Sequence, residues 1–153
     1  MLWLYQGALP TSEIYAKCEQ IALERNNGAL NVFTGIVRAE IGQNGKIEAL
    51  SFDIYKPLLQ KWFDTWQERA KAHDVYICMA HSIGDVMTHK SSYMCATISP
   101  HRTQSLEVYR TFIEDFKANA PIWKYDVMNS QRIYAKERSK PLAGSGILSP
   151  NIP

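Results

Sequence analysis

The sequence has few cysteines, and their spacing fits neither a metal site nor a disulfide framework. Cys18, Cys78 and Cys95 are three in number, far apart, and set among apolar residues. An odd number in such surroundings is typical of small buried side chains in a reducing compartment. No Cys-x-x-Cys or His-x-x-x-His pair occurs, and three of the four histidines lie eight residues apart, which suits no ligand geometry. The sequence therefore predicts no metal site.

Long apolar runs and a strong excess of charge are also missing. No apolar stretch of about 18 residues occurs, and the N-terminus lacks a basic segment followed by an apolar one. The net charge is +2 and the pI is near 8.4, without a tract of lysine and arginine. We therefore predict a soluble, cytoplasmic protein that binds neither membrane nor nucleic acid, and any anion site in it must be local.

What the sequence does have is enough apolar material for one core. The 153 residues are 46% hydrophobic, and they show no internal repeat and no composition shift that would mark a domain boundary. Residues 1–153 are therefore expected to form a single domain. Its last segment, 141–153, is rich in glycine, serine and proline, and we expect it to be mobile until a partner docks on it.

Hydrophobic periodicity predicts about three helices and several strands. Helices are expected at 11–26, 57–72 and 103–118, and strands at 2–6, 29–38, 49–54, 74–81, 91–99, 122–128 and 132–136. The strands at 29–38 and 49–54 are expected to form a hairpin across a glycine turn, and 84–89 a loop. Because a short turn joins two strands, the sheet cannot be purely parallel. The sequence thus predicts an α+β fold with a mainly antiparallel or mixed sheet.

The third helix has a one-sided apolar pattern and ends among cations. Its predicted buried face is made of Leu106, Tyr109, Ile113 and Phe116. Lys117 and Lys124 lie on either side of Pro121, which ends the helix, and His101 with Arg102 precedes it. Together these groups point to an anion. Each also has a simpler interpretation: a lysine near a helix C-terminus is usually a solvated charge, and His101 could merely cap the helix.

Arg38 and Trp123 have simpler interpretations as well. Arg38 could form a surface salt bridge with Glu40 or Glu48. Trp123 is more often a core anchor than a stacking platform.

The order of several short motifs resembles the family of the large, catalytic subunit of molybdopterin synthase. No single motif is specific, but together they span most of the chain in the family's order. They are Gly28-Ala29, Phe33-Thr34-Gly35-Ile36-Val37-Arg38, a glycine turn, Phe52-Asp53-Ile54-Tyr55, His81-Ser82-Ile83-Gly84, Ser99-Pro100-His101-Arg102, Lys117 and Pro121-Ile122-Trp123-Lys124.

The resemblance implies a fold, a reaction and partners. The fold would be of the α/β-hammerhead type, in a homodimer within a heterotetramer. Each copy would bind a small ubiquitin-like sulfur carrier whose Gly-Gly end bears a thiocarboxylate. As a sulfurtransferase, the protein would place two sulfurs on cyclic pyranopterin monophosphate, forming the dithiolene of molybdopterin for molybdenum cofactor biosynthesis. The protein itself would need no metal or organic cofactor.

The resemblance also assigns site residues. Lys117 and Lys124 would be catalytic, one orienting the thiocarboxylate and one moving protons, and both would bind substrate. The remaining substrate-binding positions would be Ile36, Val37, Arg38, His101, Arg102, Tyr125 and Asp126. The chemistry suits them, because a cyclic phosphate and a thiocarboxylate are both anions and arginine holds phosphate oxygens with a planar fork.

Three positions depart from the family pattern. Ser82 stands where arginine is usual, Tyr125 where lysine is frequent, and Asp53 where glutamate is common. The changes at Ser82 and Tyr125 leave open an inactive scaffold that only binds the sulfur carrier. A second alternative is a surface for single-stranded nucleic acid, built from the same cations with Trp123 and Tyr125.

Overall fold

The computed structural model describes residues 1–42 and 45–135, so the predicted mobile segment 141–153 lies outside it. Its helices are α1 (Thr11–Glu24), α2 (Lys56–Lys71) and α3 (Arg102–Asn119). Its strands are β1 (Leu2–Gln6), β2 (Ala29–Ile36), β3 (Ile41–Gly42), β4 (Gly45–Lys46), β5 (Ala49–Ile54), β6 (Tyr76–Met87), β7 (Ser91–Ser99), β8 (Ile122–Met128) and β9 (Gln131–Tyr134).

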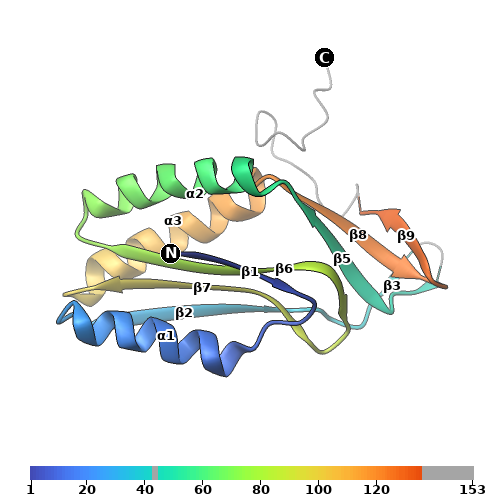
Figure 1. The fold of residues 1–153 in the computed structure, drawn as a ribbon, viewed down its shortest axis with the longest axis horizontal. Coiled ribbons are helices and arrows are strands. Elements are labelled where there is room, and N and C mark those ends of the chain that lie inside the picture. The colour runs from blue at the N-terminus through green and yellow to red at the C-terminus, as the bar shows by residue number, and fades with distance from the viewer. Residues whose placement is uncertain (43–44, 136–153) are drawn as a thin grey trace, which may run out of the picture.

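Seven of these strands form one mixed sheet. Its order is β2-β7-β6-β5-β8-β9, with β1 added beside β6. The β1–β6 pair is parallel and every other pair in the sheet is antiparallel. In Figure 1 the strands β5, β8 and β9 extend away from the helices at one end of the molecule. The predicted α+β fold, with three helices in the described ranges and a mainly antiparallel sheet, is confirmed.

Helices cover both faces of the sheet and make two cores. Figure 1 shows α1 on one face and α2 with α3 on the other. Side chains of β6 alternate between these layers, because successive residues of a strand point to opposite faces. Ile77 and Met79 pack under α2 and α3, while Cys78 and Ala80 pack against α1. All four are at most 1% exposed, which accounts for the nearly unbroken apolar run in this strand.

A shared carboxylate joins α2 to α3. Asp115 accepts hydrogen bonds from the indole N–H groups of Trp62, at 3.0 Å, and Trp66, at 2.6 Å. The Trp66 ring also meets Phe112 edge-on, with ring centroids 5.3 Å apart. The two helices are therefore held together by polar and aromatic contacts.

The predicted hairpin between residues 29–38 and 49–54 is wrong. β2 pairs with β7, whereas β5 pairs with β6 and β8. After β2 the chain turns toward the β6–β7 connection, where the amide N–H of Val37 donates to the Lys90 carbonyl at 2.9 Å. The glycine turn closes only the short β3–β4 pair. Turn residues indicated a reversal of the chain correctly, but not which strands lie beside each other.

The predicted loop at 84–89 is wrong for residues 84–87, because β6 continues through Met87, while Thr88 and His89 do lie in the turn before β7. Gly84 has a φ of +74°, and a Cβ there would clash with the side-chain nitrogen of Gln6. Glycine takes this conformation without steric cost, so the strand bends instead of ending. Before the bend β6 pairs with β1, and after it with β5.

The buried face of α3 is rotated from the predicted one. Leu106 is 49% exposed, whereas Ser105 is fully buried beside Val108 and Phe112. The Ser105 hydroxyl donates to the Thr97 carbonyl at 3.0 Å, so this polar side chain can enter the interior. Periodicity counted Ser105 as a surface residue and therefore placed the face about one position away.

Candidate functional site

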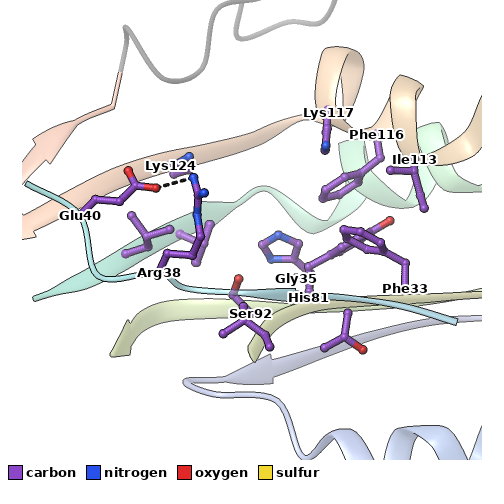
Figure 2. Close-up of a pocket in the computed structure, with 15 residues that line it drawn as sticks. Phe33, Gly35, Arg38, Glu40, His81, Ser92, Ile113, Phe116, Lys117 and Lys124 are labelled. Atoms are coloured by element: carbon purple, nitrogen blue, oxygen red, sulfur yellow. Dashed lines mark hydrogen bonds and ion pairs between the residues drawn. The ribbon is translucent and has the colours of Figure 1, made fainter. Parts of the chain in front are cut away.

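A cleft of about 480 Å³ lies between β2, the C-terminal end of α3 and the β5–β8 pair. Its size is within the usual range for small-molecule sites. Three cations line it: Arg38, Lys117 and Lys124. Four aromatic rings also line it: Phe33, Phe52, Tyr93 and Phe116. Figure 2 shows the cationic side chains directed toward the cleft from different elements. The arrangement suits an anion attached to an apolar, flat group.

Each cation is placed by a different element. Arg38 follows the end of β2, and Lys117 lies in the last turn of α3. Lys124 lies in the middle of β8, directly across from Phe52 of β5. Since directly opposed residues of an antiparallel pair share a face, the Lys124 ammonium emerges beside the Phe52 ring.

Lys124 sits in an environment that disfavours its charge. Burial lowers the pKa of its ammonium, and the nearby Arg38 guanidinium lowers it further, while Asp126 opposes them. Asp126 lies two residues along β8 on the same face, and burial raises the pKa of its carboxyl despite the attraction of Lys124. Of the cleft's cations, Lys124 thus has a structural reason to release a proton more readily than an ordinary lysine.

Arg38 does form the salt bridge that the sequence offered as its simpler role. Its guanidinium lies 2.5 Å from the Glu40 carboxylate and its side chain remains 81% exposed. Exposed pairs of this kind are weak, so an incoming anion could compete for Arg38. Ile36, also predicted, lines the cleft, while the side chain of Val37 is buried at 2% exposure and is not among the lining residues.

His101 and Arg102 lie at the opposite end of α3 from the cleft. Arg102 begins the helix and Lys117 is in its last turn, so about 22 Å of helix axis separates them. His101 occupies the N-cap position but makes no side-chain cap hydrogen bond in the part of the chain described. One copy of the chain therefore does not bring these two residues together with the lysines, contrary to the arrangement expected from the sequence.

Tyr125 projects from the other face of β8. Its ring lies under the Arg132 guanidinium, 4.2 Å from centroid to carbon, and against the ring of Tyr134. Arg132 in turn pairs with Asp53 at 2.7 Å. Neither Tyr125 nor Asp126 is among the residues lining the cleft, although Asp126 shares the strand face of Lys124.

Sequence reasoning missed the role of His81 as a lining residue. Its position in the His81–Gly84 motif predicts no contact with the substrate, but it lines the cleft and is 3% exposed. Its signal in the sequence is a histidine in an otherwise apolar, alternating strand. Ser92 and Tyr93 of β7 line the cleft too, and nothing in their local pattern indicates it.

Among residues 1–42 and 45–135, no group of three or more histidine, cysteine, aspartate and glutamate side chains is placed to hold a metal ion. No helix there is long and apolar enough to cross a membrane.

The fold and the cleft define an α+β protein with a cationic, aromatic-lined site suited to a small anionic ligand. The family model described as "MoaE protein" matches residues 8–119 of this chain. The molybdopterin synthase catalytic subunit of Helicobacter pylori is 51% identical over 149 residues, which is 97% of this chain and 100% of that protein. The chain belongs to the MoaE family, as the resemblance in its motifs indicated.

Solved structures agree with this assignment. The protein–protein complex of subunits 1 and 2 of molybdopterin-converting factor from Helicobacter pylori 26695 contains a chain with 51% identity and a TM-score of 0.86, covering 97% of this chain and 99% of that chain. Molybdopterin synthase from Staphylococcus aureus has a TM-score of 0.74 at 22% identity, covering 88% and 96%, and supports the fold.

Proposed function

We propose that this chain is the catalytic subunit of a molybdopterin synthase, transferring sulfur from a thiocarboxylated carrier to cyclic pyranopterin monophosphate to form the dithiolene. The observation that carries the proposal is the convergence of Arg38, Lys117 and Lys124 on one aromatic cleft in a member of the MoaE family. The protein works in the cytoplasm as a single domain, and no cofactor of its own takes part.

The positive charges of the cleft offset the repulsion between the two anions that this reaction brings together. The precursor brings a cyclic phosphate and the carrier brings a thiocarboxylate, so two anions must approach each other. Three cations that line the cleft offset this repulsion. Arg38 suits the phosphate because its fork can hold two oxygens, and its exposed side chain can exchange Glu40 for the ligand.

The lysines are the residues best placed for chemistry. Lys124 is half-buried, and burial lowers its pKa, so it can give up and regain a proton as C–S bonds form. Lys117 is exposed at the rim, where its charge can orient the thiocarboxylate. Asp126 lies on the same strand face, and its negative charge partly counteracts the lowering of the Lys124 pKa.

The partner supplies the sulfur through a narrow peptide end. A Gly-Gly terminus has no Cβ atoms, so its backbone can enter a cleft that larger residues would block. Because the carrier supplies the sulfur, this chain needs no exposed cysteine for catalysis. Its three cysteines, Cys18, Cys78 and Cys95, are all buried.

His101 and Arg102 can serve the same site only from a second copy. They are exposed at the far end of α3, beyond the reach of their own cleft. We therefore propose a homodimer in which each copy offers this pair to the cleft of its partner, within a heterotetramer that includes two carriers.

The test is a reconstitution with purified components. The protein, the thiocarboxylated carrier and the pyranopterin precursor are mixed, and dithiolene product is measured. Product formation that depends on all three is expected. A tight complex with the carrier but no product would instead establish the inactive scaffold left open by Ser82 and Tyr125.

A further inference from the structure

His81 is a buried polar group in the cleft that the proposed chemistry does not use. Its side chain is 3% exposed and lines the cleft from β6. Figure 2 shows its ring in the cleft, between Arg38 and Phe116. A buried imidazole of this kind must satisfy both ring nitrogens or leave one for a ligand.

One ring nitrogen is satisfied by the backbone. His81 Nδ1 lies 2.8 Å from the Ser82 carbonyl oxygen. A carbonyl only accepts, so Nδ1 carries the hydrogen and donates it. Burial also lowers the pKa of His81 to about 4, which keeps the ring neutral near pH 7. In the neutral ring with hydrogen on Nδ1, the second nitrogen, Nε2, has a lone pair and no hydrogen.

Within the described residues the His81 side chain makes its hydrogen bond through Nδ1, and no group donates one to Nε2. The ring is instead surrounded by aromatic groups. Phe52 meets it edge-on with centroids 4.9 Å apart, and Tyr93 and Phe116 each lie with centroids 5.8 Å away. The Tyr93 and Phe116 rings are themselves stacked, 3.9 Å apart and 12° from parallel.

These contacts fix the position of the acceptor. The imidazole cannot turn freely between packed rings, so its unused lone pair keeps one direction within the cleft. The cations of the same cleft attract an anionic group, while a neutral acceptor among aromatic rings attracts a flat group that carries N–H donors.

We propose that His81 is a specificity-determining residue whose Nε2 accepts a hydrogen bond from an N–H group of a fused nitrogen heterocycle, bound with its phosphate on the cations of the cleft. The inference rests on the proposed function, because a reduced pterin ring is such a heterocycle and is rich in N–H donors. His81 then recognises the ring through a hydrogen bond, while Arg38 and the lysines bind the negatively charged phosphate.

A matched pair of variants separates this role from a structural one. His81→Asn keeps an N–H near the position of Nδ1 for the Ser82 carbonyl but removes the acceptor. His81→Gln places a carbonyl oxygen near the position of Nε2 but loses the bond to Ser82. We expect the Kd for the pyranopterin precursor to rise about tenfold in His81→Asn and less than about threefold in His81→Gln.

Pyrophosphate serves as a probe of the cations alone. Its affinity should be the same in the wild-type protein and both variants, because His81 meets the ring and not the anion. His73→Asn, at an exposed position, is the control and should change neither ligand's affinity. Equal losses of precursor affinity in both His81 variants, unchanged affinity in His81→Asn, or a parallel loss of pyrophosphate binding would each overturn the proposal.

Nitrogen-15 NMR of the wild-type protein tests the same proposal without a substitution in the measured sample. We expect His81 to show hydrogen on Nδ1 and a bare Nε2, and the Nε2 resonance to move when the precursor binds. Hydrogen on Nε2, or no movement on binding, would overturn the role of His81. A wild-type protein that makes dithiolene yet fails these tests leaves the proposed function intact, whereas one that does not bind the precursor removes both.

Discussion

At the scale of single residues, the two lysines of the cleft differ in surroundings and therefore in their expected roles. Lys117 is exposed on α3, whereas Lys124 is half-buried on β8 between an attractive carboxylate and a repulsive guanidinium. A charge that only steers an anion works best in solvent contact, while a proton donor works best with a pKa near the working pH.

Replacing either lysine is expected to slow turnover. Lys117→Ala and Lys124→Ala should each lower kcat by on the order of 100-fold, because each removes a charge or proton carrier from the transition state. Steady-state product formation measures this, and far-UV circular dichroism and carrier binding should be unchanged. Lys61→Ala, at an exposed position on α2, is the control.

Lys124→Arg then separates charge from proton transfer. Arginine keeps the positive charge but does not titrate in the working range. We expect this variant to bind the precursor nearly normally and to turn it over poorly. Near-normal rates in Lys124→Arg would show that Lys124 acts through its charge alone.

His81 should make stability depend on pH. The folded protein keeps the ring unprotonated down to about pH 4, whereas the unfolded chain takes up a proton below about 6.5. Between these values the unfolded state binds more protons, so stability falls as pH falls, by roughly 3 kcal/mol in total. Urea unfolding at pH 7 and pH 4.5 measures the loss, which should be absent from His81→Asn and retained in His73→Asn. Equal losses in all three proteins would contradict the assignment.

At the scale of elements, one carboxylate links the two helices that cover one face of the sheet, in addition to their aromatic contacts. Asp115 of α3 receives both indole N–H groups of α2 and also the side-chain amide of Asn119, at 2.5 Å. The C-terminal half of α3, which carries Lys117, is thereby fixed against α2.

Removing this carboxylate should destabilise the fold. Asp115→Ala leaves two partly buried indole N–H groups without their acceptor, and we expect the free energy of unfolding to fall by roughly 2–3 kcal/mol. Denaturant titration measures the change. Asp115→Asn keeps an oxygen acceptor and should lose less, so equal losses in the two variants would show that charge or shape, and not hydrogen bonding, is responsible.

The elements also show what local patterns can predict. The bounds of β1 and β8 match the sequence-based ranges, because runs of β-forming residues there end at clear breakers. The pairing of β2 with β7 could not be predicted, since it depends on the long-range fit of strands more than 50 residues apart in sequence. The sequence predicts a loop at Gly84 because glycine is equally suited to a turn and to a bent strand, and the structure shows the bent strand, with a φ of +74°.

At the scale of the whole molecule, the basic side chains predicted to bind substrate fall into two separate sets. Arg38, Lys117 and Lys124 share one cleft, while His101 and Arg102 lie at the far end of α3. A homodimer of the kind proposed above would join the two sets across an interface, because a two-fold axis repeats each surface on the partner.

Complementation between impaired variants, assayed at a precursor concentration too low for the Arg102→Ala chain to bind it, tests this arrangement. If a cleft uses Arg102 of the second copy, mixed dimers of Lys124→Ala with Arg102→Ala chains contain one fully intact site. Random exchange should then restore about a quarter of the wild-type activity. The measurement is product formation after coexpression of the two variants.

Mixing Lys124→Ala with Lys117→Ala is the matched control. These two residues line the cleft of the same copy, so every site in the mixed dimer keeps one defect and no activity should return. A mixture of Lys124→Ala and Arg102→Ala that stays as inactive as this control would contradict the shared site.

The amino-acid sequence by itself determined the fold class, the family and the three cations of the cleft. Those conclusions depend on periodicity, residue type and motif order, which are local properties of the chain. Only the tertiary structure decided that β2 and β5 lie apart, that Tyr125 faces away from Lys124, that His81 lines the cleft, and that His101 and Arg102 do not. Each of these depends on which segments distant in sequence meet and on the face a side chain takes in the sheet, and a one-residue change of register reverses that face.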